Sequence, residues 1–181
     1  IGLIAYLLWC WASSKEENLA LWRFLQYQVF GLGLFVAGSV VLVWSQADAA
    51  GGRWSFDLLD LMRSPQIGKY QSVAFYLLFY GFAVRTPLFP LHGWLPNSAG
   101  YGLIAVAPVL LLGVKVGFYG MARFLLPLTA DAVLIWQPYV VAFAMVGIFF
   151  AAVLAFRQVS LRRLLAFAVV SHTSLIVIGL F

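Results

Sequence analysis

Long apolar stretches joined by short polar connections make up most of the chain. In order, the apolar stretches are 1–13, 20–45, 70–91, 101–126, 133–156 and 161–181. A helix that crosses the hydrocarbon of a bilayer needs about 20 predominantly apolar residues, so the pattern predicts an all-α, polytopic transmembrane helix bundle of about five and a half spans. Because both ends of the sequence lie inside apolar stretches, we expect a piece of a longer protein.

The polar connections are short, with one exception. Residues 13–18 (SSKEEN) indicate a turn, whereas residues 46–69 form the longest connection. Within it, WSFDLLDLM is amphipathic and fits either a short strand or an interfacial helical turn. Asp57, Asp60 and Arg63 follow one another at intervals of three. They could form a catalytic carboxylate site, but we favour a solvated, partly ion-paired loop.

The second apolar stretch carries small residues that suit close helix packing. Gly31, Gly33 and Gly38 predict a thin face that a neighbouring helix can approach. Gln26 and Gln28 stand near the start of the stretch, where they fit an interfacial or packing role rather than ligand binding.

Composition supports a membrane protein and excludes several other classes. Of the 181 residues, 64% are hydrophobic and 9% charged, whereas a soluble domain carries about 25% charged residues. The net charge of +5 comes from basic residues scattered among apolar stretches. We therefore expect a lipid bilayer around the chain and no nucleic-acid partner. The single cysteine, Cys10, gives no disulfide framework and no cysteine cluster for a metal.

Two cations, Arg85 and Lys115, lie inside apolar stretches, where a charge is costly and by default marks a functional site. Lys115 stands near the middle of its stretch, between Gly113 and Gly117, so that another helix can approach it. It could be a structural cation paired with a carboxylate. We favour a proton-carrying amine, because a lysine removed from water can change its charge near neutral pH.

Arg85 precedes two prolines, Pro87 and Pro90. Proline lacks a backbone N–H and disfavours helical geometry in the residue before it, so we predict a helix break near 85–90. The carbonyl end of the first half-helix suits a cation. Arginine keeps its proton at any relevant pH, so Arg85 is a fixed electrostatic partner and not a proton carrier.

Two histidines are further candidates. His172 lies inside the last stretch beside Ser171 and Thr173, where it could bond across to a neighbouring helix or relay protons. His92 follows Pro90. It could cap backbone groups, which is the interpretation that we favour, or it could shuttle protons at the mouth of a channel. No second ligand at helical spacing accompanies His92, so a metal site is not indicated.

Acidic residues are confined to the connections or their edges. None lies within an apolar stretch, and the complete set is Glu16, Glu17, Asp48, Asp57, Asp60 and Asp131. Two buried cations without an anion would be very costly. A membrane carboxylate should therefore come from sequence outside this chain or from another subunit.

The segment RTPLFPLHGWLP (85–96) resembles a motif of the antiporter-like membrane subunits of respiratory complex I, in which K-x-P-x-x-P-L-H-x-W-L-P-D is typical. The resemblance continues through residues 54–65, 110–128 and 151–172, so it covers nearly the whole chain. It is strongest to the M-type subunit, called D in photosynthetic versions. The motif separates that subunit less sharply from Mrp antiporters and membrane-bound hydrogenases.

The resemblance implies that residues 1–181 are the central part of one antiporter-like domain in a subunit of about fourteen transmembrane helices. It implies a proton-translocating NADH (or ferredoxin):quinone oxidoreductase, in which Lys115 and His172 form the central hydrophilic axis. The family's paired glutamate would lie just before Ile1. Arg85 would bias that glutamate, and His92, Ser171 and Thr173 are candidate channel residues.

Two positions depart from the family pattern. Arg85 replaces a lysine and Asn97 replaces an acid, so the charge at 85 is kept but its titration is lost. The alternatives are therefore a Mrp-type cation/proton antiporter subunit, a membrane-bound hydrogenase subunit, and a non-pumping structural subunit.

The resemblance also sets expectations for the surroundings. Quinone, FMN and iron–sulfur clusters would belong to partner subunits, with no cofactor and no redox site in this chain. Other membrane subunits would be the partners, in a bacterial inner, thylakoid or comparable energy-coupling membrane. Basic residues weakly favour the side of the connections 14–20, 92–100 and 157–162 as cytoplasmic.

Overall fold

The computed structural model of the chain describes residues 14–49, 52, 54–63, 68–101 and 107–181. Every regular element that these residues form is a helix, in agreement with the predicted all-α fold. The elements are α2 (Lys15–Ala49), α3 (Leu58–Arg63), α4 (Gly68–Arg85), α5 (Trp94–Tyr101), α6 (Ala107–Gly120), the π-helical turn η2 (Met121–Leu125), α7 (Leu126–Leu128), α8 (Ala130–Phe156) and α9 (Leu161–Leu180).

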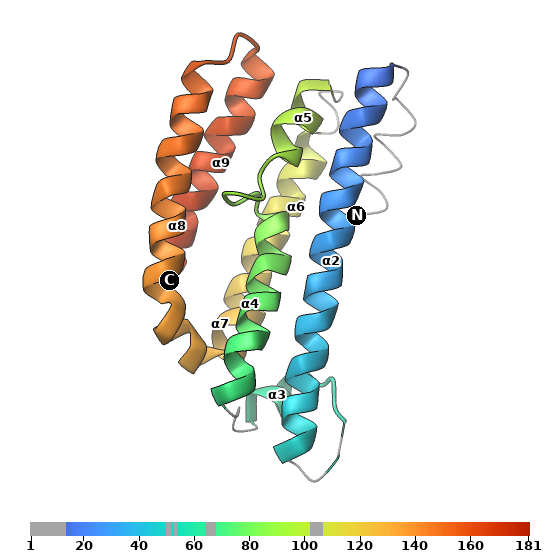
Figure 1. The fold of residues 1–181 in the computed structure, drawn as a ribbon, viewed down its shortest axis with the longest axis vertical. Coiled ribbons are helices and arrows are strands. Elements are labelled where there is room, and N and C mark those ends of the chain that lie inside the picture. Colours follow the sequence, from blue (N-terminus) through green and yellow to red (C-terminus); the bar gives the residue numbers. More distant parts are fainter. Residues whose placement is uncertain (1–13, 50–51, 53, 64–67, 102–106) are drawn as a thin grey trace.

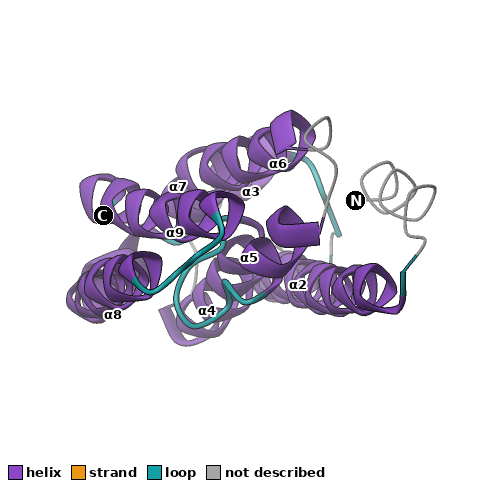
Figure 2. Cartoon of the chain, turned by 90° about the horizontal axis from the view of Figure 1, so that it is seen from above, coloured by secondary structure: helices purple, strands orange, loops and turns teal. Residues whose placement is uncertain are grey.

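The long helices run side by side along the longest axis of the molecule (Figure 1). Helix α2 packs along α4, and α8 packs along α9. Seen from above, the short α5 lies between the two pairs (Figure 2), where it contacts both α2 and α9. Within the described residues, four segments are long and apolar enough to cross a membrane, and they are Lys15–Asp48, Leu110–Leu128, Ala130–Phe156 and Leu161–Leu180. The described residues thus form a multi-pass membrane bundle, as predicted.

Helix α2 begins earlier than the polar composition of residues 13–18 suggests. The Ser14 hydroxyl accepts a hydrogen bond from the backbone N–H of Glu17 at 3.2 Å, and the Glu17 carboxylate accepts one from the backbone N–H of Ser14 at 3.0 Å. This reciprocal pair is a capping box, which satisfies donors that a helix start leaves free. The predicted turn is therefore wrong from Lys15 onward, where the polar residues form the first helical turn.

Glycines set the distance between α2 and α4. A Cβ atom on Gly81 would lie 2.9 Å from the backbone nitrogen of Phe35, and one on Gly31 would lie 2.9 Å from the Val84 Cβ. Gly38 has a comparable contact with Leu78. The predicted thin face is confirmed for Gly31 and Gly38. It stays a prediction for Gly33, because no atom of the described residues lies within 4 Å of a Cβ placed there.

Helix α6 approaches α4 in the same way. A Cβ atom on Gly117 would lie 2.5 Å from Thr86 Cγ2, and one on Gly120 would collide with the ring of Phe82. Immediately beyond, the backbone widens into η2, where the N–H of Leu126 reaches the carbonyl of Met121. The following Pro127 has no N–H to continue an α-helical ladder. The close contacts between α6 and α4 thus lie at the end of α4, next to the prolines.

The buried side chains form two clusters near opposite ends of the bundle. One includes Leu42, Leu61 and Leu78 and lies toward α3. The other surrounds α5 and consists of Phe24, Trp94, Leu95, Leu110, Ala151, Ala166 and Val170. Within the segment WSFDLLDLM, residues 58–62 form a helical turn rather than a strand, because the Asp57 carboxylate accepts a hydrogen bond from the backbone N–H of Leu59 and caps α3.

Candidate functional site

The predicted helix break is present between α4 and α5. Helix α4 ends at Arg85, residues 86–93 form consecutive turns, and α5 begins at Trp94. The Phe89–Pro90 peptide bond is cis. The break thus contains both prolines, as the sequence predicts. Arg85 is therefore the last residue of the first half-helix.

Hydrogen bonds from the break satisfy the carbonyl groups that α4 leaves open. The N–H and the hydroxyl of Thr86 donate to the carbonyl of Phe82 at 2.9 and 3.1 Å, and the N–H of Leu88 donates to Ala83 at 3.1 Å. The indole N–H of the buried Trp94 donates to Val84 at 2.8 Å. Irregular backbone at membrane depth needs such internal partners, because the bilayer core offers no water.

Arg85 is half-buried, and Gln28 on α2 is its partner. One guanidinium nitrogen of Arg85, Nη1, donates a hydrogen bond to Oε1 of Gln28 at 3.4 Å. Gln28 itself is 5% exposed. A partly open cavity of about 350 Å³ lies beside the pair, and the residues that line it are Gln28, Gly31, Leu32, Phe35, Gly81, Phe82, Val84, Arg85 and Val116. Helices α2, α4 and α6 therefore meet around a cavity with a cation in its wall.

Gln28 is a site residue that the sequence interpretation missed. The sequence predicts a packing role for it, and no spacing along the chain links it to Arg85, which is 57 positions away. One signal was available, however. Gln28, Gly31, Phe35 and Gly38 share one helical face, which is the face of the glycine contacts. A polar residue on a close-packed face in a membrane requires a hydrogen-bonding partner.

His92 lies within the break and is 8% exposed. Its ring lies near those of Phe89, Phe150 and Phe167, at centroid distances of 5.9, 5.6 and 6.3 Å. The Nδ1 atom is buried and has no hydrogen-bond partner among the described residues. Since Phe150 belongs to α8 and Phe167 to α9, His92 joins the break to the second helix pair.

Lys115 lies on α6 with its side chain on the outer surface of the described bundle. The neighbouring side chains on this surface are Leu111, Leu112, Val116 and Tyr119, all exposed. In contrast, Val114 and Gly117 are buried, and Gly117 faces the end of α4. The single lysine therefore stands in an otherwise apolar face, and its predicted place on a central axis stays a prediction.

The candidate residues on α9 differ in burial. Thr173 is buried and its hydroxyl donates to the carbonyl of Val170 at 2.8 Å, while the half-buried Ser171 donates to Ile148 on α8 at 3.4 Å. His172, which stands between them in the sequence, is exposed. The structure thus places Arg85 and His92 at the break and leaves Lys115 and His172 on the surface of the described part of the chain.

The acidic residues lie where the sequence predicts. Glu16 and Glu17 belong to the first turn of α2, and Asp131 belongs to the first turn of α8. Asp48 ends the membrane-spanning part of α2, while Asp57 and Asp60 accept hydrogen bonds at α3. All six acids are described, and none lies beside Arg85 or Lys115.

A bundle of apolar helices, one of them broken at a half-buried arginine, defines an integral, multi-pass membrane protein. The family described as NADH:quinone oxidoreductase/Mrp antiporter, transmembrane region, matches residues 1–181. The chain therefore belongs to this family of antiporter-like complex I membrane subunits, as the motif at 85–96 indicates.

Relatives and solved structures agree with this membership. Subunit M of the NADH-quinone oxidoreductase of Mycobacterium tuberculosis is 32% identical over 97% of the chain, and that of Escherichia coli K12 is 33% identical over 94%. The chain spans about a third (33%) of the length of each. It superposes on respiratory complex I of Thermus thermophilus with a TM-score of 0.84 and 25% identity, covering 98% of the chain and 37% of that one.

A second solved structure shows the same fold. A membrane-bound sulfane sulfur reductase, an archaeal respiratory membrane complex, has a TM-score of 0.79 and 22% identity over 98% of the chain and 36% of its own. The helical arrangement is therefore shared by proteins of two respiratory complexes.

Proposed function

We propose that the chain is the central part of a proton-translocating membrane subunit in a redox-driven NADH (or ferredoxin):quinone oxidoreductase. The observation that carries the proposal is the helix break at Arg85, with a buried polar partner and an adjacent cavity inside a membrane bundle. Charged groups within a membrane generally mark ion pathways. Family membership supports the same function.

Lys115 and Arg85 take different roles in this proposal. Lys115 gains and loses the transported proton, because an amine can do so and a guanidinium cannot. Arg85 supplies a fixed positive field at the carbonyl end of α4. His172 passes the proton onward, with His92, Ser171 and Thr173 as channel residues. A glutamate outside residues 1–181 pairs with the cations.

The exposed position of Lys115 and His172 fits this assignment. Each stands on a helix face that the described residues leave uncovered, and the relatives are about three times as long as the chain. Sequence beyond this segment would cover both faces and bury the two side chains. Partner subunits of the complex would supply the FMN, iron–sulfur and quinone sites.

The test is a Lys115→Ala variant of the complete complex, reconstituted in vesicles. Proton uptake per electron should fall while the complex still assembles. A Lys115→Arg variant should fail equally, because it keeps the charge but cannot release the proton. Lys15→Ala serves as the control, since Lys15 is exposed in the first turn of α2. Normal proton uptake by Lys115→Ala would disprove the role.

A second candidate is a cation/proton antiporter subunit, because the family includes Mrp antiporters. Ion exchange driven by an imposed gradient, without an electron donor, would favour this candidate. A third, a non-pumping structural subunit, is favoured by an arginine at the break where the related subunits typically carry a lysine. Increased pumping by Arg85→Lys would support the third candidate.

A further inference from the structure

Gln28 is a buried polar side chain in the middle of a membrane-spanning helix. It is 5% exposed and lies within Lys15–Asp48, the span near the N-terminus. An amide removed from water costs several kcal/mol unless it is hydrogen-bonded. The bond to Arg85 meets this need for the Oε1 atom, so the two side chains depend on each other.

The helix backbones fix where the Gln28 amide can reach. Gly31 lies one turn further along α2, on the same face, and a Cβ there would lie 2.9 Å from the Val84 Cβ. Gly81 brings α4 equally close to Phe35. Because α2 and α4 touch through glycines, neither helix can slide or rotate freely against the other. Gln28 is thus held opposite the end of α4.

The amide binds the guanidinium without neutralising it. Glutamine offers a neutral oxygen acceptor, whereas a carboxylate at the same position would cancel the charge. The guanidinium has five N–H donors in a rigid planar fork, so a bond at Nη1 restrains the whole group. The cavity of about 350 Å³ beside the pair gives an unrestrained arginine space in which to move.

We propose that Gln28 is a positioning residue, which holds the Arg85 guanidinium on the α2 side of the cavity without neutralising its positive charge. The charge then acts on whatever acid approaches the cavity. This inference rests on the proposed function where it concerns the control of proton translocation. Its structural part, the position of the guanidinium, stands independently.

The experiment compares Gln28→Leu and Gln28→Glu in the complete complex in vesicles. Leucine is similar in size to glutamine but offers no acceptor. We expect proton uptake per electron to fall at least about twofold in Gln28→Leu, because the free energy of a hydrogen bond to a charged group exceeds RT. Gln28→Glu should lower it further, by pairing with Arg85, and should restore uptake at a pH low enough to protonate the new carboxyl group. Gln26→Leu is the matched control, because Gln26 lies two residues away and is exposed.

A double-mutant cycle separates positioning from a merely structural role. In an Arg85→Met background, Gln28→Leu should cause no further loss, because the group that it positions is absent. Equal losses in both backgrounds would overturn the proposal, as would a Gln28→Leu variant that behaves like Gln26→Leu.

A cryo-EM structure of the Gln28→Leu complex supplies a readout that needs no activity. The Arg85 guanidinium should leave the α2 side of the cavity, whereas an unchanged guanidinium would overturn the proposal. If the unmodified complex translocates no protons, the proposed function fails, and the displacement of Arg85 still decides the role of Gln28.

Discussion

The indole N–H of Trp94 donates a hydrogen bond to the backbone carbonyl of Val84, and this bond of 2.8 Å closes the broken end of α4. The Trp94 ring also meets Phe24 edge-on, at a centroid distance of 5.4 Å. One side chain thus connects the first residue of α5 with α4 and α2. Arg85 follows Val84 directly, so its position depends on this connection.

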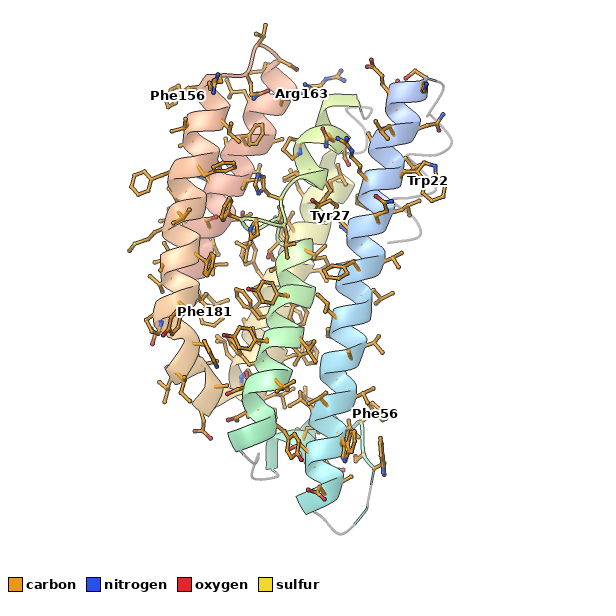
Figure 3. The ribbon with its side chains drawn as sticks, viewed as in Figure 1. Trp22, Tyr27, Phe56, Phe156, Arg163 and Phe181 are labelled. Atoms are coloured by element: carbon orange, nitrogen blue, oxygen red, sulfur yellow. The ribbon has the colours of Figure 1, made fainter. Side chains whose placement is uncertain are left out.

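Trp94→Phe should destabilise the break while keeping an aromatic ring in place. The variant leaves the Val84 carbonyl buried without its donor, at a cost of about 1–3 kcal/mol. The thermal midpoint of the purified complex should fall. Trp22→Phe is the control, since Trp22 is 64% exposed and projects outward from α2 (Figure 3), and an equal effect of the two substitutions would contradict the prediction.

Gly117→Ala should separate α6 from α4. The added methyl group would lie 2.5 Å from Thr86 Cγ2, and overpacking of this kind costs about 1–3 kcal/mol. Thermal denaturation of the complex measures the loss. Gly33→Ala is the matched control in a membrane helix, because no atom of the described residues lies within 4 Å of its added Cβ and alanine favours helix formation.

His92→Phe should distinguish packing from proton transfer at the break. The three neighbouring rings accept an aromatic replacement, and the buried Nδ1 without a described partner disappears. Stability should therefore be kept or increased, while proton uptake per electron should fall if the imidazole belongs to the channel, as proposed. Unchanged uptake would assign His92 to packing alone. His92→Ala, which leaves a void, should lower stability in either case.

Ser14→Ala should weaken the start of α2. The substitution removes the acceptor for the backbone N–H of Glu17, which is typically worth about 1 kcal/mol. Ser160→Ala offers a matched comparison, because Ser160 precedes α9 and its side chain makes no capping hydrogen bond. Proteolysis near the start of α2 should increase in the first variant only. Increased cleavage in both variants would show that the capping box has no special effect.

The features predicted correctly from the sequence have local causes. Pro87 and Pro90 limit the backbone beside them, so the break at Arg85 could be located without a structure. The four long spans follow from the length of their apolar stretches. The first turn of α2 was missed although its cause is equally local, because charged side chains outweighed the spacing of Ser14 and Glu17.

The remaining site depends on contacts between distant residues. Gln28 and Arg85 meet only because glycines bring α2 and α4 together, and no spacing along the chain shows this. Two of the three rings around His92, those of Phe150 on α8 and Phe167 on α9, follow it by more than fifty residues. Composition also could not show that Lys115 and His172 lie on uncovered faces, because periodicity identifies an apolar helix without identifying its neighbours.

Because of the π-helical turn at Met121–Leu125, the helical segment that begins with α6 can lose one residue without changing its direction. A π turn contains about one residue more than the 3.6 of an α turn, so removing one residue there converts it to α-helix without rotating the segments on either side. The same deletion between Val114 and Gly120 would turn one part of α6 by about 100° against the other. Related chains can therefore differ by one residue after Gly120 and still present Lys115 in the same direction.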